Sequence, residues 1–153
     1  MKTPGIKRLA GLLAALTFTA WPCIPALAET GRLIIKATGF KSDKGQVLFV
    51  VVDSPEAYDD LGANDSAANS IARSLVKIFS GKAQGCFVLP VGWYAVSVVH
   101  DQNSNSVLDA NFLGIPKEPY GFSNNPKGLG KPSFKAVKFK LDKGQKNIEV
   151  IVE

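Results

Sequence analysis

The segment 47–52, which reads Val-Leu-Phe-Val-Val-Val, constrains the fold more than any other part of the chain. It is six apolar residues long and lies between Gly45-Gln46 and Asp53-Ser54-Pro55. A buried helix needs a longer run, whereas β-branched and aromatic residues at this length are typical of a strand. Because no polar residue alternates with the apolar ones, both faces of this strand must be covered. The chain is therefore expected to form a layered β structure.

Six further segments have the composition of short strands. Their ranges are 32–40, 75–80, 86–91, 93–100, 133–142 and 147–152. Polar, glycine-containing stretches at 41–45, 81–85 and 142–146 predict hairpin loops between consecutive strands. In 133–142, Val137, Phe139 and Leu141 alternate with lysines, which predicts one buried and one solvated face. The pattern predicts an all-β fold, a seven-stranded and mostly antiparallel β-sandwich.

Two stretches interrupt the strands. Ser54 followed by Pro55 is a helix-start signal, and we expect a short helix over 56–61. The polar, alanine-rich segment 62–74 fits either a second helical turn or a loop. The other stretch, 101–132, is a loop of a length that is usually functional or disordered in a compact domain.

The N-terminus predicts export. Lys2, Lys7 and Arg8 precede the apolar run 9–20, and Ala26-Leu27-Ala28 supplies small residues for a signal peptidase. The run is about 12 residues, shorter than the ~20 that span a bilayer, so an N-terminal anchor is the less favoured interpretation. We expect a signal peptide at 1–28, cleavage after Ala28, and a periplasmic or secreted domain at 29–153 without a membrane span.

Cleavage changes what the charge and the cysteines imply. Three of the 18 basic residues and none of the 13 acidic ones precede position 29, so the net charge falls from +5 to +2. A nucleic-acid partner is therefore not indicated. Only Cys86 remains, which excludes an internal disulfide, and its apolar neighbours predict a buried structural thiol.

The composition of the long loop predicts that it is ordered. Phe112, Leu113, Ile115, Tyr120 and Phe122 are apolar groups with which it could dock onto the sandwich. A disordered linker contains fewer such residues. Glycines and prolines spaced along 114–132 are expected to set its turns.

The start of this loop resembles the first nine positions of a calcium-binding loop. The matching side chains are those of Asp101, Asn103, Asn105 and Asp109. The backbone carbonyl of Val107 would add a further oxygen, and Glu118 could complete the set. Ser106 stands where glycine is usual, and Phe112 where a bidentate acid is expected, so the site would be weak. The alternative is that these Asp and Asn side chains bind backbone amides and stabilise turns.

His100, the only histidine, should share a strand face with Tyr94, Val96 and Val98. It either anchors the root of the loop or contacts a ligand. Asp101 points to the opposite face, and no nucleophile-elbow signature is present, so catalysis by such a pair is not favoured.

One histidine and one mature cysteine cannot form a zinc site of these ligands. The second half of the loop is rich in aromatic, amide and hydroxyl groups that could bind a sugar or a peptide backbone. Together with His100, the candidate ligand-binding residues are Tyr120, Phe122, Ser123, Asn124 and Asn125. The same polar side chains could instead satisfy turns within the loop.

Three blocks of sequence resemble a known family. They are LPVGWYAV at 89–96, HDQNSN at 100–105 with Asp109, and GIPKEPYGFSNN at 114–125. This chain resembles the bacterial exported family called domain of unknown function 2141, from Leu33 to its end. The family usually has glycine where this chain has Ser106. The resemblance implies a secreted or periplasmic protein without an established activity.

The segment entering the strand at 93–100 is also similar to transthyretin-like (prealbumin-like) and carboxypeptidase-regulatory-like sandwich modules, which are generally accessory or binding domains. We therefore expect a non-catalytic binding or structural module, with calcium or another hard cation at the long loop. Two alternatives stay open. One is a small hydrolase or lyase using His100 with Asp101 or Glu118, and the other is a module that binds an unknown periplasmic or extracellular protein.

Overall fold

The computed structural model describes residues 28–61, 69–113, 115–128 and 130–153. Within these ranges the chain forms eight strands and two short helices. The strands are β1 (Thr30–Thr38), β2 (Gln46–Val52), β3 (Ala72–Val76), β4 (Lys82–Pro90), β5 (Gly92–Asp101), β6 (Tyr120–Phe122), β7 (Phe139–Leu141) and β8 (Gly144–Ile151). The helices are α1 (Pro55–Asp59) and α2 (Phe134–Val137). The predicted class, a mostly antiparallel β-sandwich, is confirmed.

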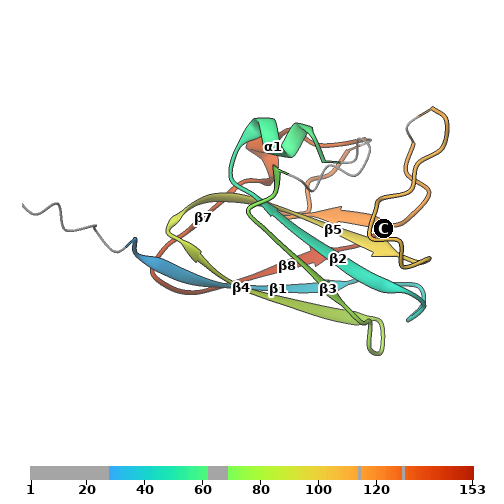
Figure 1. The fold of residues 1–153 in the computed structure, drawn as a ribbon, viewed down its shortest axis with the longest axis horizontal. Helices are drawn as coiled ribbons and strands as arrows, with labels where there is room; N and C mark the ends of the chain where they lie inside the picture. Colours follow the sequence, from blue (N-terminus) through green and yellow to red (C-terminus); the bar gives the residue numbers. More distant parts are fainter. Residues whose placement is uncertain (1–27, 62–68, 114, 129) are drawn as a thin grey trace, which may run out of the picture.

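The strands form two facing sheets (Figure 1). One sheet has the order β4-β1-β8, in which β1 runs antiparallel to β4 and parallel to β8. The other has the order β3-β2-β5-β6, and β7 pairs with the beginning of β5. β7 pairs with Gly92–Tyr94 and β6 with Ser97–Val99, so these short strands meet successive parts of β5.

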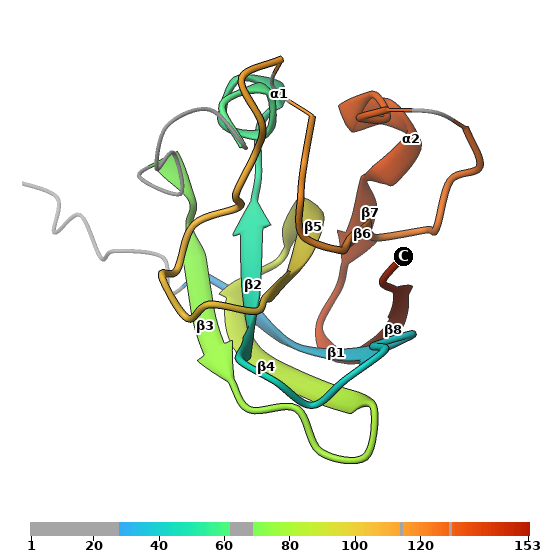
Figure 2. The same ribbon diagram turned by 90° about the vertical axis from the view of Figure 1, so that its right-hand side faces the viewer.

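The central strand β2 is buried on both faces, as its sequence predicts. Val47, Phe49 and Val51 pack into the core between the two sheets. Leu48, Val50 and Val52 face the other way, into a second core that includes Ala57 and Tyr58 of α1 and Val137 of α2. Figure 2 shows the two helices on this outer side of the sheet. The sheet is therefore a middle layer between its partner sheet and the two helices.

The prediction of three hairpin loops is wrong, because none of the three segments joins two strands of the same sheet. The segment 41–45 joins β1 to β2 and 142–143 joins β7 to β8, and in both cases the two strands lie in different sheets. Between β3 and β4 the chain reverses instead at Ser80 and Gly81, both with positive φ, between the bridged residues Phe79 and Lys82. Polar loops with glycine fit a crossing between sheets as well as a hairpin, so their composition could not separate the two.

The described residues form eight strands rather than the predicted seven, and the strand expected at 75–80 lies at Ala72–Val76. The segment 133–142 is a helical turn, α2, followed by the three-residue strand β7. Its alternating apolar side chains therefore pack into two different cores. Val137 lies in the outer core, whereas Phe139 and Leu141 lie in the inner one. The short strand β6 lies inside 101–132, where no strand was predicted.

Helix α1 begins as predicted and ends earlier. The Ser54 hydroxyl accepts a hydrogen bond from the Ala57 amide at 3.2 Å, and Pro55 is the first helical residue. The helix ends at Asp59 rather than Leu61. Residues 62–68, in the segment left open between helix and loop, lie outside the described residues, and β3 begins at Ala72.

Cys86 is exposed, which overturns the predicted buried thiol. Alternation along β4 turns Ala83, Phe87 and Leu89 toward the core, and Cys86 therefore points outward. Apolar neighbours do not imply burial here, because no described residues form a layer over the outer face of this sheet. The predicted signal peptide lies outside the described residues. Among the residues described, no helix is long and apolar enough to cross a membrane.

Candidate functional site

The chain between β5 and α2 is ordered by attachment to both sheets. Its strand β6 pairs with β5, and the backbones of Tyr120 and Glu153 exchange two hydrogen bonds of 3.2 Å. Gly121 lies against β8 so closely that a Cβ there would be 2.2 Å from the Ile151 carbonyl oxygen. Only glycine allows this approach of the loop to the second sheet. The loop thus closes one open edge of the sandwich.

The first turn of the loop is organised by the buried carboxylate of Asp101. One oxygen accepts the Asn105 amide at 3.0 Å, and the other accepts the Ser106 amide and the Gln46 side chain, both at 2.8 Å. Ser104 and Ser106 adopt left-handed backbone conformations, with φ of 62° and 66°. Glycine adopts this conformation without strain, so the backbone at Ser106 is one that glycine would suit better.

Further side chains of the predicted calcium loop do converge. The amides of Asn103 and Asn105 donate to the two carboxylate oxygens of Asp109 at 2.6 and 3.1 Å. Their own oxygens accept the backbone amides of Asn105 and Val107 at 3.0 and 2.9 Å. These are the Asx turns of the alternative interpretation. The motif therefore forms a compact hydrogen-bonded loop.

Glu118, which follows this loop in the sequence, binds back to its backbone. Its buried carboxylate accepts the Gln102 amide at 2.8 Å and the Asp109 amide at 3.2 Å. The remote acid expected from the sequence therefore lies beside the motif, and it joins the two ends of the segment 102–118.

The electrostatics of this cluster are unusual for buried acids. The ion pairs of Lys140 with Asp142 and of Lys143 with Glu29 lie outside this cluster. Asp101 and Glu118 are buried with N–H donors, and neither forms an ion pair with a described lysine or arginine. No three acidic, histidine or cysteine side chains among the described residues are grouped closely enough to hold a metal ion. Each carboxylate has four lone-pair positions, however, and the hydrogen bonds leave some of them free.

His100 lies apart from the cluster. Its ring is fully buried between the sheets and meets Phe40 edge-on at 5.2 Å. Nε2 lies 2.8 Å from the Lys44 carbonyl oxygen and therefore carries the proton, since a carbonyl only accepts. Nδ1 has no partner among the described residues. The expected face, shared with Tyr94, Val96 and Val98, is the one observed.

The side chains of Ser123 and Asn124 form hydrogen bonds within the fold. The buried Ser123 hydroxyl donates to the Val137 carbonyl at 2.7 Å and accepts the Val96 amide at 3.0 Å. The Asn124 amide donates to the carbonyls of Ala136 and Lys138, both at 3.1 Å. Both side chains therefore fasten α2 to the loop, which is the self-satisfying role considered for this tail.

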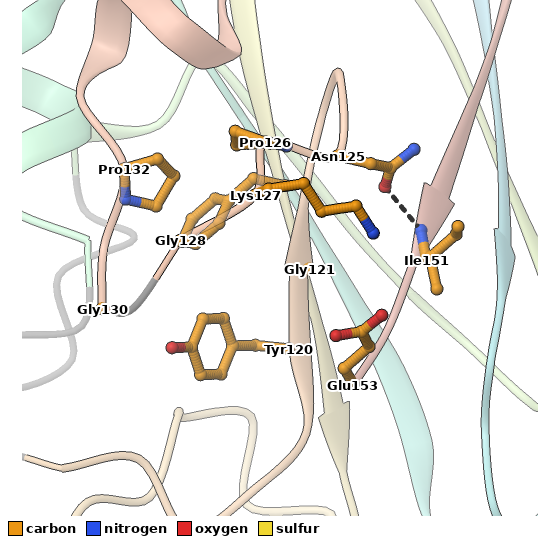
Figure 3. Close-up of a pocket in the computed structure, with 11 residues that line it drawn as sticks. Tyr120, Gly121, Asn125, Pro126, Lys127, Gly128, Gly130, Pro132, Ile151 and Glu153 are labelled. Carbon is orange, nitrogen blue, oxygen red and sulfur yellow. Dashed lines mark hydrogen bonds between the residues drawn. The ribbon is translucent and has the colours of Figure 1, made fainter.

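The other candidate ligand residues do share a concave surface. Tyr120, Phe122 and Asn125 line a groove of 450 Å³ between β6, the end of β8 and the segment 125–132. Sequence reasoning missed its remaining lining, which consists of Gly121, Pro126, Lys127, Gly128, Gly130, Pro132, Ile151 and Glu153. Figure 3 shows the Tyr120 ring, the Lys127 ammonium and the Glu153 carboxylate around the groove.

The wall of this groove is held by hydrogen bonds on two sides. The Asn125 side chain accepts the Ile151 amide at 2.8 Å and donates to the Glu149 carbonyl at 3.0 Å. On the other side the Lys131 ammonium donates to the carbonyls of Tyr58, Asp59 and Leu61 at 2.6–2.9 Å. Lysine at the carbonyl end of a helix is favourable, so Lys131 fixes the segment to α1.

Burial shifts the pKa of several ionisable groups in the described part of the chain. Burial, and then the carboxylate of Asp59, raises the pKa of the Tyr58 hydroxyl well above its ordinary value. Burial lowers the pKa of Lys131, and the carboxylates of Asp59 and Asp60 partly oppose this. Burial also raises the pKa of Tyr94, whose hydroxyl donates to the Pro90 carbonyl at 2.8 Å. Both tyrosines therefore stay neutral near pH 7.

The fold and the loop define a class: a small β-sandwich domain with one long, ordered connection that carries a groove. A family model described as "Uncharacterized protein conserved in bacteria (DUF2141)" matches residues 35–149, and the chain belongs to this family. No curated protein matches the chain, and no solved structure does. The similarity to transthyretin-like modules therefore stays a prediction.

Replacing Ser123 by alanine should destabilise the domain. The substitution leaves the buried Val96 amide and Val137 carbonyl without this partner. We expect a loss of about 2–3 kcal/mol in the free energy of unfolding, measured by urea denaturation. Ser133→Ala is the control, because Ser133 is exposed and makes no capping bond, and it should change stability by less than about 0.5 kcal/mol. Equal stability of the two variants would contradict the assignment.

Replacing Glu118 by alanine should loosen the loop locally. Two hydrogen bonds from amides to a buried carboxylate are lost. With each worth about 1.5–3 kcal/mol, we expect hydrogen exchange at the Gln102 and Asp109 amides to accelerate at least about tenfold. The exposed Glu149→Ala is the matched control. Unchanged exchange at both amides in Glu118→Ala would show that the carboxylate does not hold the loop.

Proposed function

We propose that this protein is an exported, non-catalytic binding module whose β5–α2 loop forms the ligand site. The observation that carries the proposal is the groove behind β6, which has a volume of 450 Å³ and walls fixed by Asn125 and Lys131. Binding sites are usually preformed concave surfaces of this size with apolar and aromatic linings and a few polar groups. The groove combines these features.

The chemistry of the lining suggests the kind of ligand. Tyr120 offers a ring face, and Lys127 and Glu153 offer one charge of each sign. Such a set suits a polar ligand with a flat or ring-shaped apolar side, such as a saccharide or a short peptide segment. His100 supports the non-catalytic part of the proposal, because its buried ring lies outside the groove lining.

A second candidate function is weak calcium binding by the loop 101–118. It is favoured by one observation, the burial of the Asp101 and Glu118 carboxylates without a lysine or arginine among the described residues. Buried charges in proteins are generally paired or bind metal ions. Carboxylate, amide and carbonyl oxygens are the ligands that calcium prefers. The residues that would hold it are Asp101, Asn103, Asn105, Val107, Asp109 and Glu118.

The groove is tested with a panel of oligosaccharides and short peptides in saturation-transfer NMR. We expect at least one compound to bind the unaltered protein, and Tyr120→Ala to weaken it about tenfold or more by removing the ring face. Lys127→Ala is a milder second variant, since its exposed side chain makes no bond within the fold among the described residues. Trp93→Ala, an exposed aromatic outside the groove lining, is the control. No binding, or binding that ignores Tyr120, would reject the groove as the site.

Calcium binding is tested by thermal unfolding with calcium or with a chelator. For a dissociation constant of about 1 mM, 10 mM calcium should stabilise the domain by about 1.4 kcal/mol, or about 5 °C in Tm. Asp109→Asn should abolish the shift, whereas Asp142→Asn, an exposed acid outside this loop, should keep it. Identical Tm values with calcium and with chelator would show that this loop does not bind calcium.

A further inference from the structure

The outer part of the loop belongs neither to the groove nor to the acidic cluster. Residues 109–113 and 115–118, here called the finger, leave and return to the cluster through a paired stem. The amide of Lys117 donates to the Asp109 carbonyl at 2.8 Å, and Ala110 bridges to Pro116. In Figure 1 the loop rises from the end of β5, on the side of the sheet where α1 lies, and its outer part stands clear of the strands.

The tip of the finger is strongly apolar and uncovered. Phe112 is 95% exposed, Leu113 67% and Ile115 56%. Single exposed apolar residues are ordinary, but a cluster of large ones marks an interaction surface. Transfer of these side chains from water to an apolar phase would lower the free energy.

Three backbone amides of the tip are paired within the finger. The Asn111 side-chain oxygen accepts the amides of Leu113 and Ile115 at 2.9 and 3.0 Å. The Asn111 amide donates to the Ile115 carbonyl at 2.8 Å. Such pairing is unnecessary in water, where the solvent can satisfy these groups. In a lipid environment each amide paired in this way lowers the cost of insertion, because an unpaired backbone group there costs several kcal/mol.

The stem is rigid and carries polar groups at the level behind the tip. The Asp109 carboxylate holds the amides of Asn103 and Asn105, and its backbone amide is held by Glu118. The exposed Lys117 is part of this stem, and no ion pair of it is found in the described ranges. Apolar groups therefore lie outermost, with charged and polar groups behind them, as in segments that sit at a membrane interface.

From these four observations we propose that the finger inserts its tip into the surface of a lipid bilayer and docks the domain there. The tip is a projecting point rather than a hollow or flat face, so a deformable apolar layer fits it without a complementary protein groove. Lys117 would then lie at the level of the headgroups, where anionic lipids attract it. The proposal is independent of what the groove binds.

The test is sedimentation with vesicles of phosphatidylethanolamine and phosphatidylglycerol, using the chain in its natural processed form. We expect the unaltered protein to bind, and the triple variant Phe112→Ser, Leu113→Ser, Ile115→Ser to bind at least about tenfold more weakly. The three side chains are exposed, so the variant should fold normally, which circular dichroism checks. Lys117→Glu should weaken binding to these vesicles and have little effect on phosphatidylcholine vesicles.

Two controls make the outcome specific. Phe79→Ser with Val88→Ser removes exposed apolar groups elsewhere and should bind vesicles like the unaltered protein. Tyr120→Ala should also bind normally, which separates the finger from the groove. Failure of the unaltered protein to bind any vesicle would overturn the proposal, as would equal binding by the triple variant. Capture of a partner protein through the tip without vesicle binding would likewise show that the finger serves a protein interface.

Discussion

Burial of β2 and β5 on both faces is the constraint on which the rest of this structure depends. The inner face of β2 packs Phe49 against the second sheet, and the outer face packs Val50 beneath the helices. A strand with two apolar faces is stable only when something covers each of them. The two short helices and the β5–α2 loop supply the outer cover. The loop proposed to bind ligand is therefore part of the hydrophobic architecture.

Because the loop covers the outer face of the sheet, a connection of this length can be ordered. Tyr120 and Phe122 pack against the outer core, and the buried Ser123 hydroxyl ties the loop to β5 and α2. Conformational entropy opposes ordering of a long loop, and apolar burial together with satisfied backbone groups offsets it. The loop can then carry a groove in its second half and a projecting tip near its middle. Neither would keep its shape on a mobile segment.

Local patterns predicted what depends on local chemistry. The run 47–52, the Ser54 cap and the clustering of Asp101 with Asn103 and Asn105 follow from neighbouring residues, and all are observed. Contacts between distant segments were not predictable in this way. The β1–β8 pairing, the outward direction of Cys86, and the approach of Lys127 and Glu153 to one groove depend on which sheet each strand joins. The close contact of Gly121 with β8 was equally hidden, although its glycine could have signalled it.

The parallel pairing of β1 with β8 has a consequence for how the chain reaches this fold. Its register runs from Gly31 with Gly144 to Thr38 with Ile151, so partners are separated by more than one hundred positions. Closing so large a loop is entropically costly, and contacts of this kind slow the search for the native state. The β4-β1 pair can form early, but its sheet stays incomplete until the last strand is available. Assembly of this domain is therefore expected to finish with its C-terminal strand, as a late and cooperative step.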